Sequence, residues 1–203
     1  FADSEIEKWG KVIRAANVKA EIIIADQPFD YVLDPEQYGH GLIALGTVTM
    51  HGAAKNETFV RLAVEPLAGA TTLTLATPVT GWQVGDKVVL PDSRQYALES
   101  NQQYTQQYEE ATIAAISADG RTITLAAPLQ FNHPGAHDGN GTLTFLPHVA
   151  NRTRNVVLKS ASSFGTRGHV YFTYRAAIDV RYVQFGGLGR TTFNLIDNTT
   201  FNT

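Results

Sequence analysis

Three histidines border predicted β-strands and are the side chains best suited to metal or proton chemistry. They are His51, His148 and His169, each next to a short apolar run. An imidazole binds transition metals through either ring nitrogen, and it gains or loses a proton near neutral pH. If strands stack so that the rings share one edge, they predict a site for one divalent metal ion with an open position, or an acid/base cluster. In the alternative interpretation, each ring hydrogen-bonds the backbone of its own buried turn.

A second group of charged side chains surrounds His169. Arg167 lies just before it, and Asp179 follows in the next predicted strand. An arginine can neutralise the carboxylate of a uronic acid, and a histidine oriented by an aspartate can then move a proton at that sugar. We predict His169, Arg167 and Asp179 as a catalytic set, with Arg154 and Arg190 holding the polysaccharide. In the alternative hypothesis, Arg167 pairs with Asp179 only to hold neighbouring strands together.

The charge of the chain is unevenly distributed along the sequence. Sixteen Lys and Arg residues oppose nineteen Asp and Glu residues, which gives a net charge of −3. Residues 151–203 contain seven cations and two carboxylates, a balance of +5 that leaves −8 for residues 1–150. An acidic chain is not expected to be a general nucleic-acid binder, whereas a local basic stretch can attract an anionic polymer.

The composition restricts the class of protein further. Of the 203 residues, 43% are hydrophobic and 17% are charged, so the chain can form a buried core and is not a disordered chain. Disulfide bonds and thiolate metal sites are excluded because the sequence has no cysteine. No apolar run approaches the length of a membrane span.

Short β-strands must position the candidate residues, because helical periodicity is confined to Asp3–Ala16. Glu21–Ala25 and Leu42–Met50 are apolar runs typical of buried strands. Near the end of the chain, Asn155–Leu158 and Asp179–Tyr182 are similar strands that begin 24 residues apart. Short strands that recur at this distance, separated by polar turns, are typical of the coils of a parallel β-helix.

The middle of the chain has a different pattern. Thr71–Val79 and Arg121–Leu129 resemble each other, and in both segments apolar residues alternate with threonine. This alternation is typical of strands with one buried and one exposed face. The dipeptide Asp119-Gly120 predicts a hairpin with a type I′ turn between two strands. We therefore expect an inserted antiparallel, barrel-like subdomain.

Together these patterns predict four segments. They are an N-terminal segment with helical character at 1–20, the first β-helix coils at 21–57, the antiparallel insertion at 58–147 and further coils at 148–203. Asp197–Thr203 is typical of the start of another strand, and a bare last coil would expose an unpaired edge. We expect a further segment or another chain to cap that end.

Three short motifs are distinctive: WQVGD at 82–86, TRN at 153–155 and GTRGH at 165–169. They resemble the eight-glycine domain found in fibrocystin and in cell-surface and secreted hyaluronidases, and the first two are the most specific. The stretch IDVRYVQFGGLGRTT at 178–192 looks like the β-helix that follows this domain in bacterial members. The resemblance covers most of residues 40–203. It implies an all-β fold, a right-handed parallel β-helix with a β-rich insertion, in a secreted or surface-exposed protein with polysaccharide as its ligand.

These observations lead to two functional hypotheses. The first is an extracellular or cell-surface protein that acts on an acidic polysaccharide as a lyase or glycoside hydrolase, with or without a divalent metal ion. The alternative is a non-catalytic structural or glycan-binding module.

Overall fold

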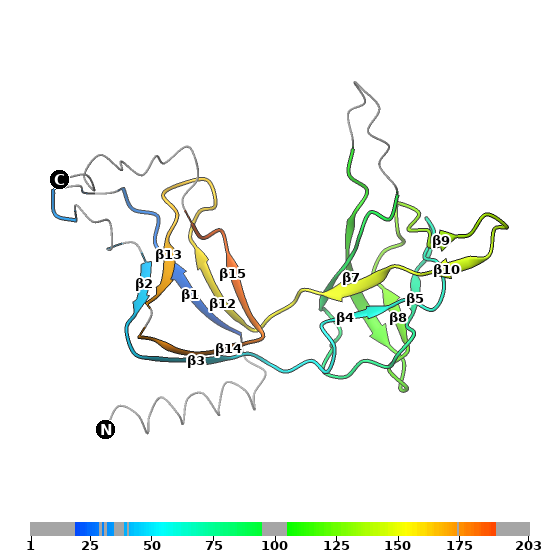
Figure 1. The fold of residues 1–203 in the computed structure, drawn as a ribbon, viewed down its shortest axis with the longest axis horizontal. Helices are drawn as coiled ribbons and strands as arrows, with labels where there is room; N and C mark the ends of the chain where they lie inside the picture. The colour runs from blue at the N-terminus through cyan, green and yellow to red at the C-terminus, as the bar shows by residue number, and fades with distance from the viewer. Residues whose placement is uncertain are drawn as a thin grey trace. The chain divides into compact units, whose positions relative to one another are not determined.

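The computed structural model describes residues 19–28, 30, 32–34, 39, 41–94, 105–173 and 175–189. Every regular element in these residues is a β-strand, which confirms the all-β prediction (Figure 1). The predicted helix at Asp3–Ala16 and the predicted strand start at Asp197–Thr203 lie outside the described residues. Within those residues, no helix is long and apolar enough to span a membrane.

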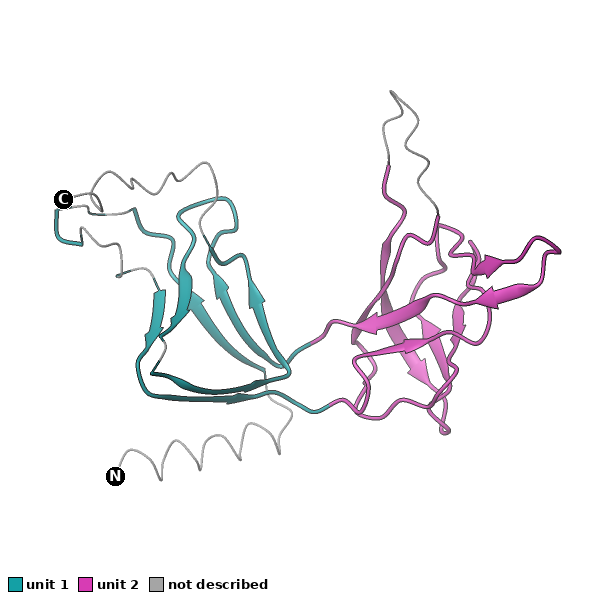
Figure 2. Cartoon of the chain, in the orientation of Figure 1, with its two compact units in different colours: residues 1–54, 154–203 teal, residues 55–153 magenta. Residues whose placement is uncertain are grey.

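The chain forms two compact units (Figure 2). Unit 1 combines Phe1–Ala54 with Arg154–Thr203, and unit 2 is the continuous stretch Lys55–Thr153 inserted between them.

Unit 1 is a stack of parallel β-helix coils, as the sequence predicts. Its first coil contains β1, β2 and β3, its second contains β12, β13 and β14, and β15 begins a third layer (Figure 1). Strands of successive coils pair in parallel and form three sheets, β1–β12–β15, β2–β13 and β3–β14. Their bounds are β1 (Ala20–Ile24), β2 (Gly41–Ala44), β3 (Thr47–His51), β12 (Val156–Ser160), β13 (His169–Phe172), β14 (Ala177–Arg181) and β15 (Val183–Gly186).

Among the described residues of this stack, the buried hydrophobic side chains are Val157 and Leu158, both in the middle layer. Ile22, Leu158 and Phe185 are register partners in β1, β12 and β15, so they form one column across three layers. Leu158 in the middle is 0% exposed, whereas Ile22 is 50% exposed and Phe185 is 44% exposed. Each coil therefore depends on its neighbours to cover its apolar side chains.

The chain leaves unit 1 after β3 and returns just before β12, and Asn155 joins these two points. Its Oδ1 accepts a hydrogen bond of 2.6 Å from the backbone N–H of Ala53. Its backbone oxygen accepts another, of 2.7 Å, from the N–H of Ala20. Gly52 is required beside it, because a Cβ there would lie 2.1 Å from the backbone oxygen of Tyr182. These contacts give a structural role to the asparagine of the TRN motif.

Unit 2 is an antiparallel sheet closed into a small barrel. Its strand order is β4-β11-β6-β7-β8-β5. The two outer strands meet through a bridge between Leu62 and Leu75, flanked by hydrogen bonds from Ala63 N to Thr74 O and from Ala76 N to Arg61 O, both 2.8 Å. The strands are β4 (Phe59–Arg61), β5 (Thr72–Thr74), β6 (Lys87–Leu90), β7 (Glu109–Ile116), β8 (Thr122–Leu125) and β11 (His148–Asn151), with a small hairpin of β9 (Ala136–His137) and β10 (Leu143–Phe145).

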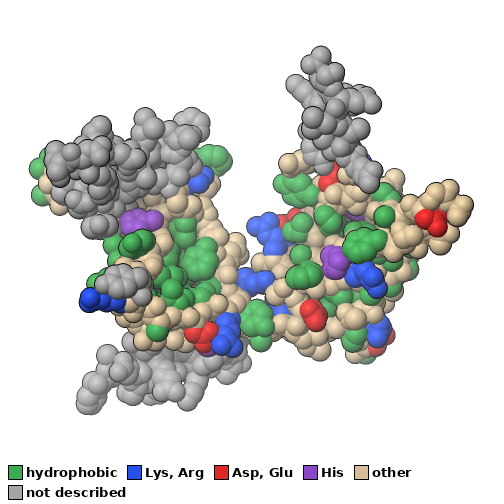
Figure 3. All heavy atoms as spheres, in the orientation of Figure 1, with side chains coloured by type: hydrophobic (Ala, Val, Ile, Leu, Met, Phe, Trp, Pro, Cys, Tyr) green, Lys and Arg blue, Asp and Glu red, His purple; other side chains and the backbone are tan. Residues whose placement is uncertain are grey.

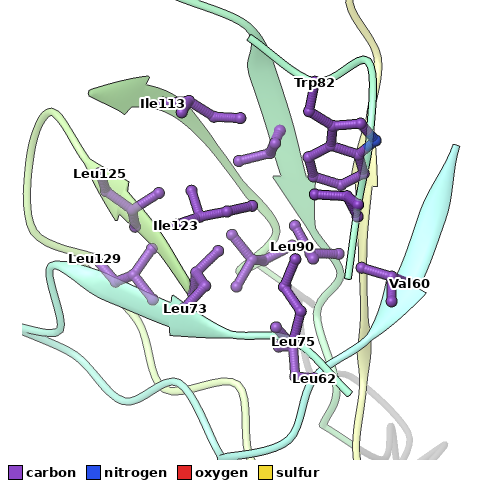
Figure 4. Packing of buried hydrophobic residues seen from close by; sticks show 13 residues of the cluster. Val60, Leu62, Leu73, Leu75, Trp82, Leu90, Ile113, Ile123, Leu125 and Leu129 are labelled. Atoms are coloured by element: carbon purple, nitrogen blue, oxygen red, sulfur yellow. The ribbon is translucent and has the colours of Figure 1, made fainter. Parts of the chain in front are cut away.

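The barrel encloses a continuous hydrophobic core (Figure 4). The alternation seen in the sequence places every second residue of a strand inside, as in β4, where Val60 is buried between two exposed neighbours. The two similar segments at 71–79 and 121–129 supply the paired strands β5 and β8. The core contains Val60, Leu62, Leu73, Leu75, Val79, Trp82, Val88, Leu90, Ile113, Ile123, Leu125, Leu129 and Val149.

A buried polar network explains most of the WQVGD motif. Asp86 Oδ2 accepts hydrogen bonds from Lys55 Nζ at 2.8 Å, Asn151 Nδ2 at 2.7 Å and the backbone N–H of Gln83 at 3.0 Å. Trp82 Nε1 donates to the backbone oxygen of Glu57 at 2.7 Å. Lys55 and Asn151 lie near the first and last residues of unit 2, so Asp86 joins its two ends.

The hairpin between β7 and β8 forms where the sequence predicts it, but the turn is not type I′. A type I′ turn needs positive φ at both central residues, and only Gly120 has it, at 68°, while Asp119 does not. Gly120 N instead donates to Ser117 O, and Asp119 Oδ1 accepts the hydroxyl of Ser117 and the N–H of Arg121. This arrangement fits a three-residue loop that ends in a left-handed glycine.

The insertion is longer in the structure than the predicted range 58–147. Residues 148–151, which the sequence prediction assigns to the β-helix, form β11 and pair with β4 and β6 of the barrel. Val149 and Asn151 are buried inside the barrel. This alternation of an outward and an inward residue is the same in both kinds of β-structure, so the sequence alone did not assign the strand correctly.

Candidate functional site

The candidate site lies on the polar face of the β3–β14 sheet in unit 1. His51 ends β3, and Asp179 and Arg181 lie on β14, where Arg181 is the register partner of His51. Register partners in a parallel pair and alternate residues of one strand share a face of the sheet. The intervening residues Met50 and Val180 therefore point to the opposite face, and the three polar side chains lie together.

Asp179 is in contact with both of its neighbours on this face. Arg181 Nε donates a hydrogen bond of 2.7 Å to Asp179 Oδ1. His51 Nε2 lies 2.8 Å from Asp179 Oδ2, an ion-pair distance when the ring is protonated, although the oxygen lies too far off the ring N–H direction for a hydrogen bond. The bond from Arg181, and next the contact with His51, hold the pKa of Asp179 below its ordinary value. The carboxylate is therefore ionised at neutral pH.

The two basic side chains keep part of their hydrogen-bonding capacity for a ligand. Arg181 is 67% exposed and is held through Nε, and its terminal Nη groups bond no other side chain in the described part of the chain. His51 Nδ1 likewise has no hydrogen bond within the described residues. A guanidinium edge can bind a carboxylate through two parallel hydrogen bonds, and an imidazole nitrogen beside it can exchange a proton.

The structure brings only one member of the predicted catalytic set to this site. Asp179 contacts His51 and Arg181, and not the predicted partners Arg167 and His169. Arg167 lies in the loop between β12 and β13, where its Nε donates to the backbone oxygen of Ser163 at 2.7 Å. The expected Arg167–Asp179 pair of the alternative hypothesis is absent as well. The reason is that Asp179 lies in a different sheet of the coil from β13.

His169 begins β13 and faces a glycine across the sheet. Its register partner is Gly41 on β2, and a Cβ at Gly41 would lie 2.6 Å from His169 Nε2 and Cδ2. The missing side chain of Gly41 is therefore what leaves room for the imidazole. Of the predicted ligand-binding residues, Arg154 is the first residue of unit 1 after the insertion, and Arg190 lies outside the described residues.

The three predicted metal ligands lie in three different sheets. His51 is on β3 and His169 on β13, both in unit 1, while His148 is on β11 of unit 2. In the residues that the structure describes, no three His, Cys, Asp or Glu side chains form a group that could hold a metal ion.

The sequence analysis did not predict Arg181 as part of the site. It predicted His51 as a metal ligand, but it did not predict the contact of His51 with Asp179. The spacing of Asp179 and Arg181 was a usable signal, because residues two apart in a strand share a face. The position of His51 next to them was not readable, since all of unit 2 lies between β3 and β14 in the sequence.

Comparisons with known proteins confirm the resemblance to the eight-glycine domain family. The chain is 33% identical to human Fibrocystin-L over 131 residues and 32% identical to mouse Fibrocystin-L over 121 residues. These matches cover 62% and 58% of the chain, but the chain spans only 3% of either relative. A G8 domain-containing protein of Dictyostelium discoideum is 28% identical over 151 residues, 74% of the chain and 9% of that protein. No family model matches the chain.

Phage tailspikes are among the solved structures that are similar to this chain. The tailspike gp61 of Pseudomonas phage phi297 has a TM-score of 0.36 and 12% identity, and the match covers 83% of this chain and 22% of the tailspike. The Gp54 tailspike of Acinetobacter baumannii bacteriophage AP22, solved with a capsular saccharide, has a TM-score of 0.36 and 10% identity over 87% of this chain and 30% of the tailspike.

Proposed function

We propose that this chain is part of an extracellular or cell-surface protein and that unit 1 binds an acidic polysaccharide on the outer face of the β3–β14 sheet. The proposal depends on one observation: Asp179 holds Arg181 through Nε, so the guanidinium is oriented while its terminal nitrogens remain available beside His51. In this arrangement Arg181 binds the carboxylate of a uronic acid. The extracellular or cell-surface localisation in this proposal is supported by the resemblance to the eight-glycine domain.

The chemistry at this site would be a proton transfer at the bound sugar. With the uronate carboxylate neutralised by Arg181, neutral His51 accepts the proton from the adjacent ring carbon through Nδ1. The electron pair of that bond forms a carbon–carbon double bond, the bond to the leaving sugar oxygen breaks, and that oxygen takes up a proton from water. The products are a new chain end and an unsaturated uronate, as in a polysaccharide lyase.

A non-catalytic glycan-binding module is the second candidate function, and one observation favours it. The oxygen of Asp179 lies off the hydrogen-bond direction of His51 Nε2, so the carboxylate does not fix the imidazole as it would in a hydrogen-bonded pair. Binding requires only Arg181 in place, whereas elimination also requires an oriented base.

Calorimetric titration of the purified chain with oligogalacturonate tests the binding step, with a neutral maltooligosaccharide of equal length as the control ligand. Arg181→Gln is expected to weaken oligogalacturonate binding about tenfold or more, because it removes a charged bidentate contact. Arg167→Gln is the matched control, because Arg167 lies in the loop between β12 and β13 and not on the β3–β14 sheet. Equal affinity of Arg181→Gln and the parent would contradict the proposal.

The same samples decide between the two candidate functions. A rise in ultraviolet absorbance from unsaturated ends, lost in His51→Gln while oligogalacturonate still binds, supports elimination. Binding of oligogalacturonate without any such products supports the non-catalytic module.

A further inference from the structure

The outer surface of the unit 2 barrel carries a cluster of aromatic rings next to basic side chains. The imidazole of His148 lies between two phenylalanines, with ring centroids 5.7 Å from Phe59 and 5.9 Å from Phe145. Phe59 is 58% exposed and Phe145 is 50% exposed. Large aromatic side chains are normally buried, so two that stand exposed around a histidine indicate a surface for a ligand.

The pairing of β4 with β11 places Arg61 next to this aromatic cluster. Arg61 is the register partner of His148, and Phe59 is the partner of Ala150, in the antiparallel pair β4–β11. Phe59 and Arg61 therefore share the outer face, while Val60 between them is buried in the core. In Figure 3, a histidine of this unit has hydrophobic and basic side chains directly around it. Phe59, Arg61, Phe145 and His148 are called the aromatic face below.

The basic side chains of unit 2 differ in whether they have a partner within the described residues. Arg152 is paired with Glu110, and Lys87 Nζ donates to the hydroxyl of Thr112 at 2.5 Å. Arg61 makes no side-chain hydrogen bond or ion pair within the described residues. A cation without a partner next to exposed rings suits a ligand that joins an anionic group to a flat apolar surface.

A uronic acid has this combination of groups. The C–H face of a pyranose ring packs on an aromatic side chain, and its carboxylate pairs with a guanidinium. We propose that the aromatic face is a second binding site for acidic sugars, separate from the β3–β14 site and contained in unit 2. The choice of sugar as the ligand rests on the proposed function, whereas the position of the site rests only on the geometry of β4, β10 and β11.

Titration of the full chain tests this site. Because unit 1 carries its own proposed site, the titrations use Arg181→Gln as the background, so that the binding that remains reports on unit 2. Phe59→Ala and Arg61→Gln are each expected to weaken oligogalacturonate binding about tenfold, the size of effect that a central contact gives. Both side chains are exposed, so the thermal unfolding midpoint should not change.

Two matched variants control for the loss of an exposed ring and of a cation. Phe164→Ala removes a phenylalanine of unit 1 that is 100% exposed. Arg121→Gln removes a unit 2 arginine whose Nη1 is bonded to the backbone oxygen of Ala76. Neither is expected to change the affinity for oligogalacturonate.

Two results would overturn the proposal. One is oligogalacturonate binding that Phe59→Ala and Arg61→Gln leave unchanged. The other is a polyglutamate peptide that binds as tightly as the sugar and loses affinity in the same variants, which would identify an acidic peptide as the ligand. Failure of the unit 1 proposal has a different signature, namely unchanged binding in Arg181→Gln itself.

Discussion

Units 1 and 2 bury their apolar side chains to very different extents. Among the described residues, thirteen buried hydrophobic side chains belong to the barrel of unit 2, and only Val157 and Leu158 belong to unit 1. A closed barrel covers its own interior, because its outer strands pair with each other. A coil of a β-helix covers only the coil next to it, so a stack of few layers leaves its outer layers exposed.

The two units also differ because, among the described residues, unit 2 holds an ion pair in its interior and unit 1 does not. Unit 2 keeps the Lys55–Asp86 pair inside, whereas Asp179 and Arg181 of unit 1 lie at the surface. A buried pair is costly to break, while an exposed pair contributes little to stability. The charges of unit 1 can therefore exchange one partner for a ligand, and those buried in unit 2 cannot.

The largest effect is expected when Asp86 of unit 2 is removed. Asp86→Ala leaves the ammonium of Lys55 buried without its carboxylate, and the free energy of unfolding of unit 2 should fall by about 3–5 kcal/mol. Denaturant unfolding followed by fluorescence measures this in a Trp9→Phe background, where Trp82 is the remaining tryptophan. The double variant Lys55→Met with Asp86→Leu should lose much less, because no charge is left unpaired. A loss in Asp86→Ala no larger than in the double variant would contradict the role of the pair.

A smaller loss is expected from a cavity in the barrel core. Leu90 on β6 is fully buried, and Leu90→Ala should lower the free energy of unfolding of unit 2 by about 2–5 kcal/mol. The intensity of amide signals from unit 1 in a two-dimensional NMR titration with denaturant should follow an unchanged transition. If both units lose stability together, they unfold as one cooperative system and the comparison between them fails.

A pH-dependent loss is expected from the pair of His133 and Glu109 in unit 2. His133 is fully buried, with Nδ1 2.6 Å from Pro91 O and Nε2 2.8 Å from Glu109 Oε1. Burial raises the pKa of Glu109, but hydrogen bonds from Gln130 N, His133 and Phe131 N outweigh it and lower the pKa below the ordinary 4.5.

The direction of the pH effect follows from that lowered pKa. The folded state favours the ionised carboxylate, so the stabilisation is complete above pH 4.5 and is lost as the pH falls through the lower, folded value. Glu109→Gln should cost about 1–3 kcal/mol at neutral pH and should flatten the decline in acid. Thermal unfolding between neutral and acidic pH measures both. An acid decline as steep in Glu109→Gln as in the parent would exclude this carboxylate as its cause.

Much of the fold could be predicted from local patterns, and the site could be predicted only in part. The threonine alternation identified β5 and β8, and the recurrence of short strands identified the parallel coils, because both signals lie within a few neighbouring residues. The type of the β7–β8 turn could not be read, since Asp119 uses its side chain to bond Ser117 and Arg121 instead of adopting positive φ. Local sequence shows that a turn forms more reliably than it shows which backbone conformation closes it.

The site was harder to predict because its residues come from different coils. Asp179 and Arg181 share one strand, so their common face follows from the sequence. The contact of His51 with Asp179 follows only from the pairing of β3 with β14, which depends on how unit 2 is inserted. His169 is closer to Asp179 in sequence, but a corner between β13 and β14 places it in another sheet. Proximity in sequence was therefore a misleading guide to proximity in a β-helix.

The smallest effect is expected at the outer layer of unit 1. A substitution there tests directly whether the outer coil is less well covered than the middle coil. Ile22 on β1 is half exposed, so Ile22→Ala should lower the stability of unit 1 by roughly 1 kcal/mol, about half the value of burying the whole side chain. Leu158→Ala, in the middle of the same column, is the matched reference and should cost about 2–5 kcal/mol. Hydrogen exchange of the β12 amides measures both losses in one experiment. Equal losses of stability would mean that Ile22 is as fully buried in solution as Leu158. In that case the outer layer of unit 1 would be covered as well as the core of the unit 2 barrel, and the proposed difference between the units would be wrong.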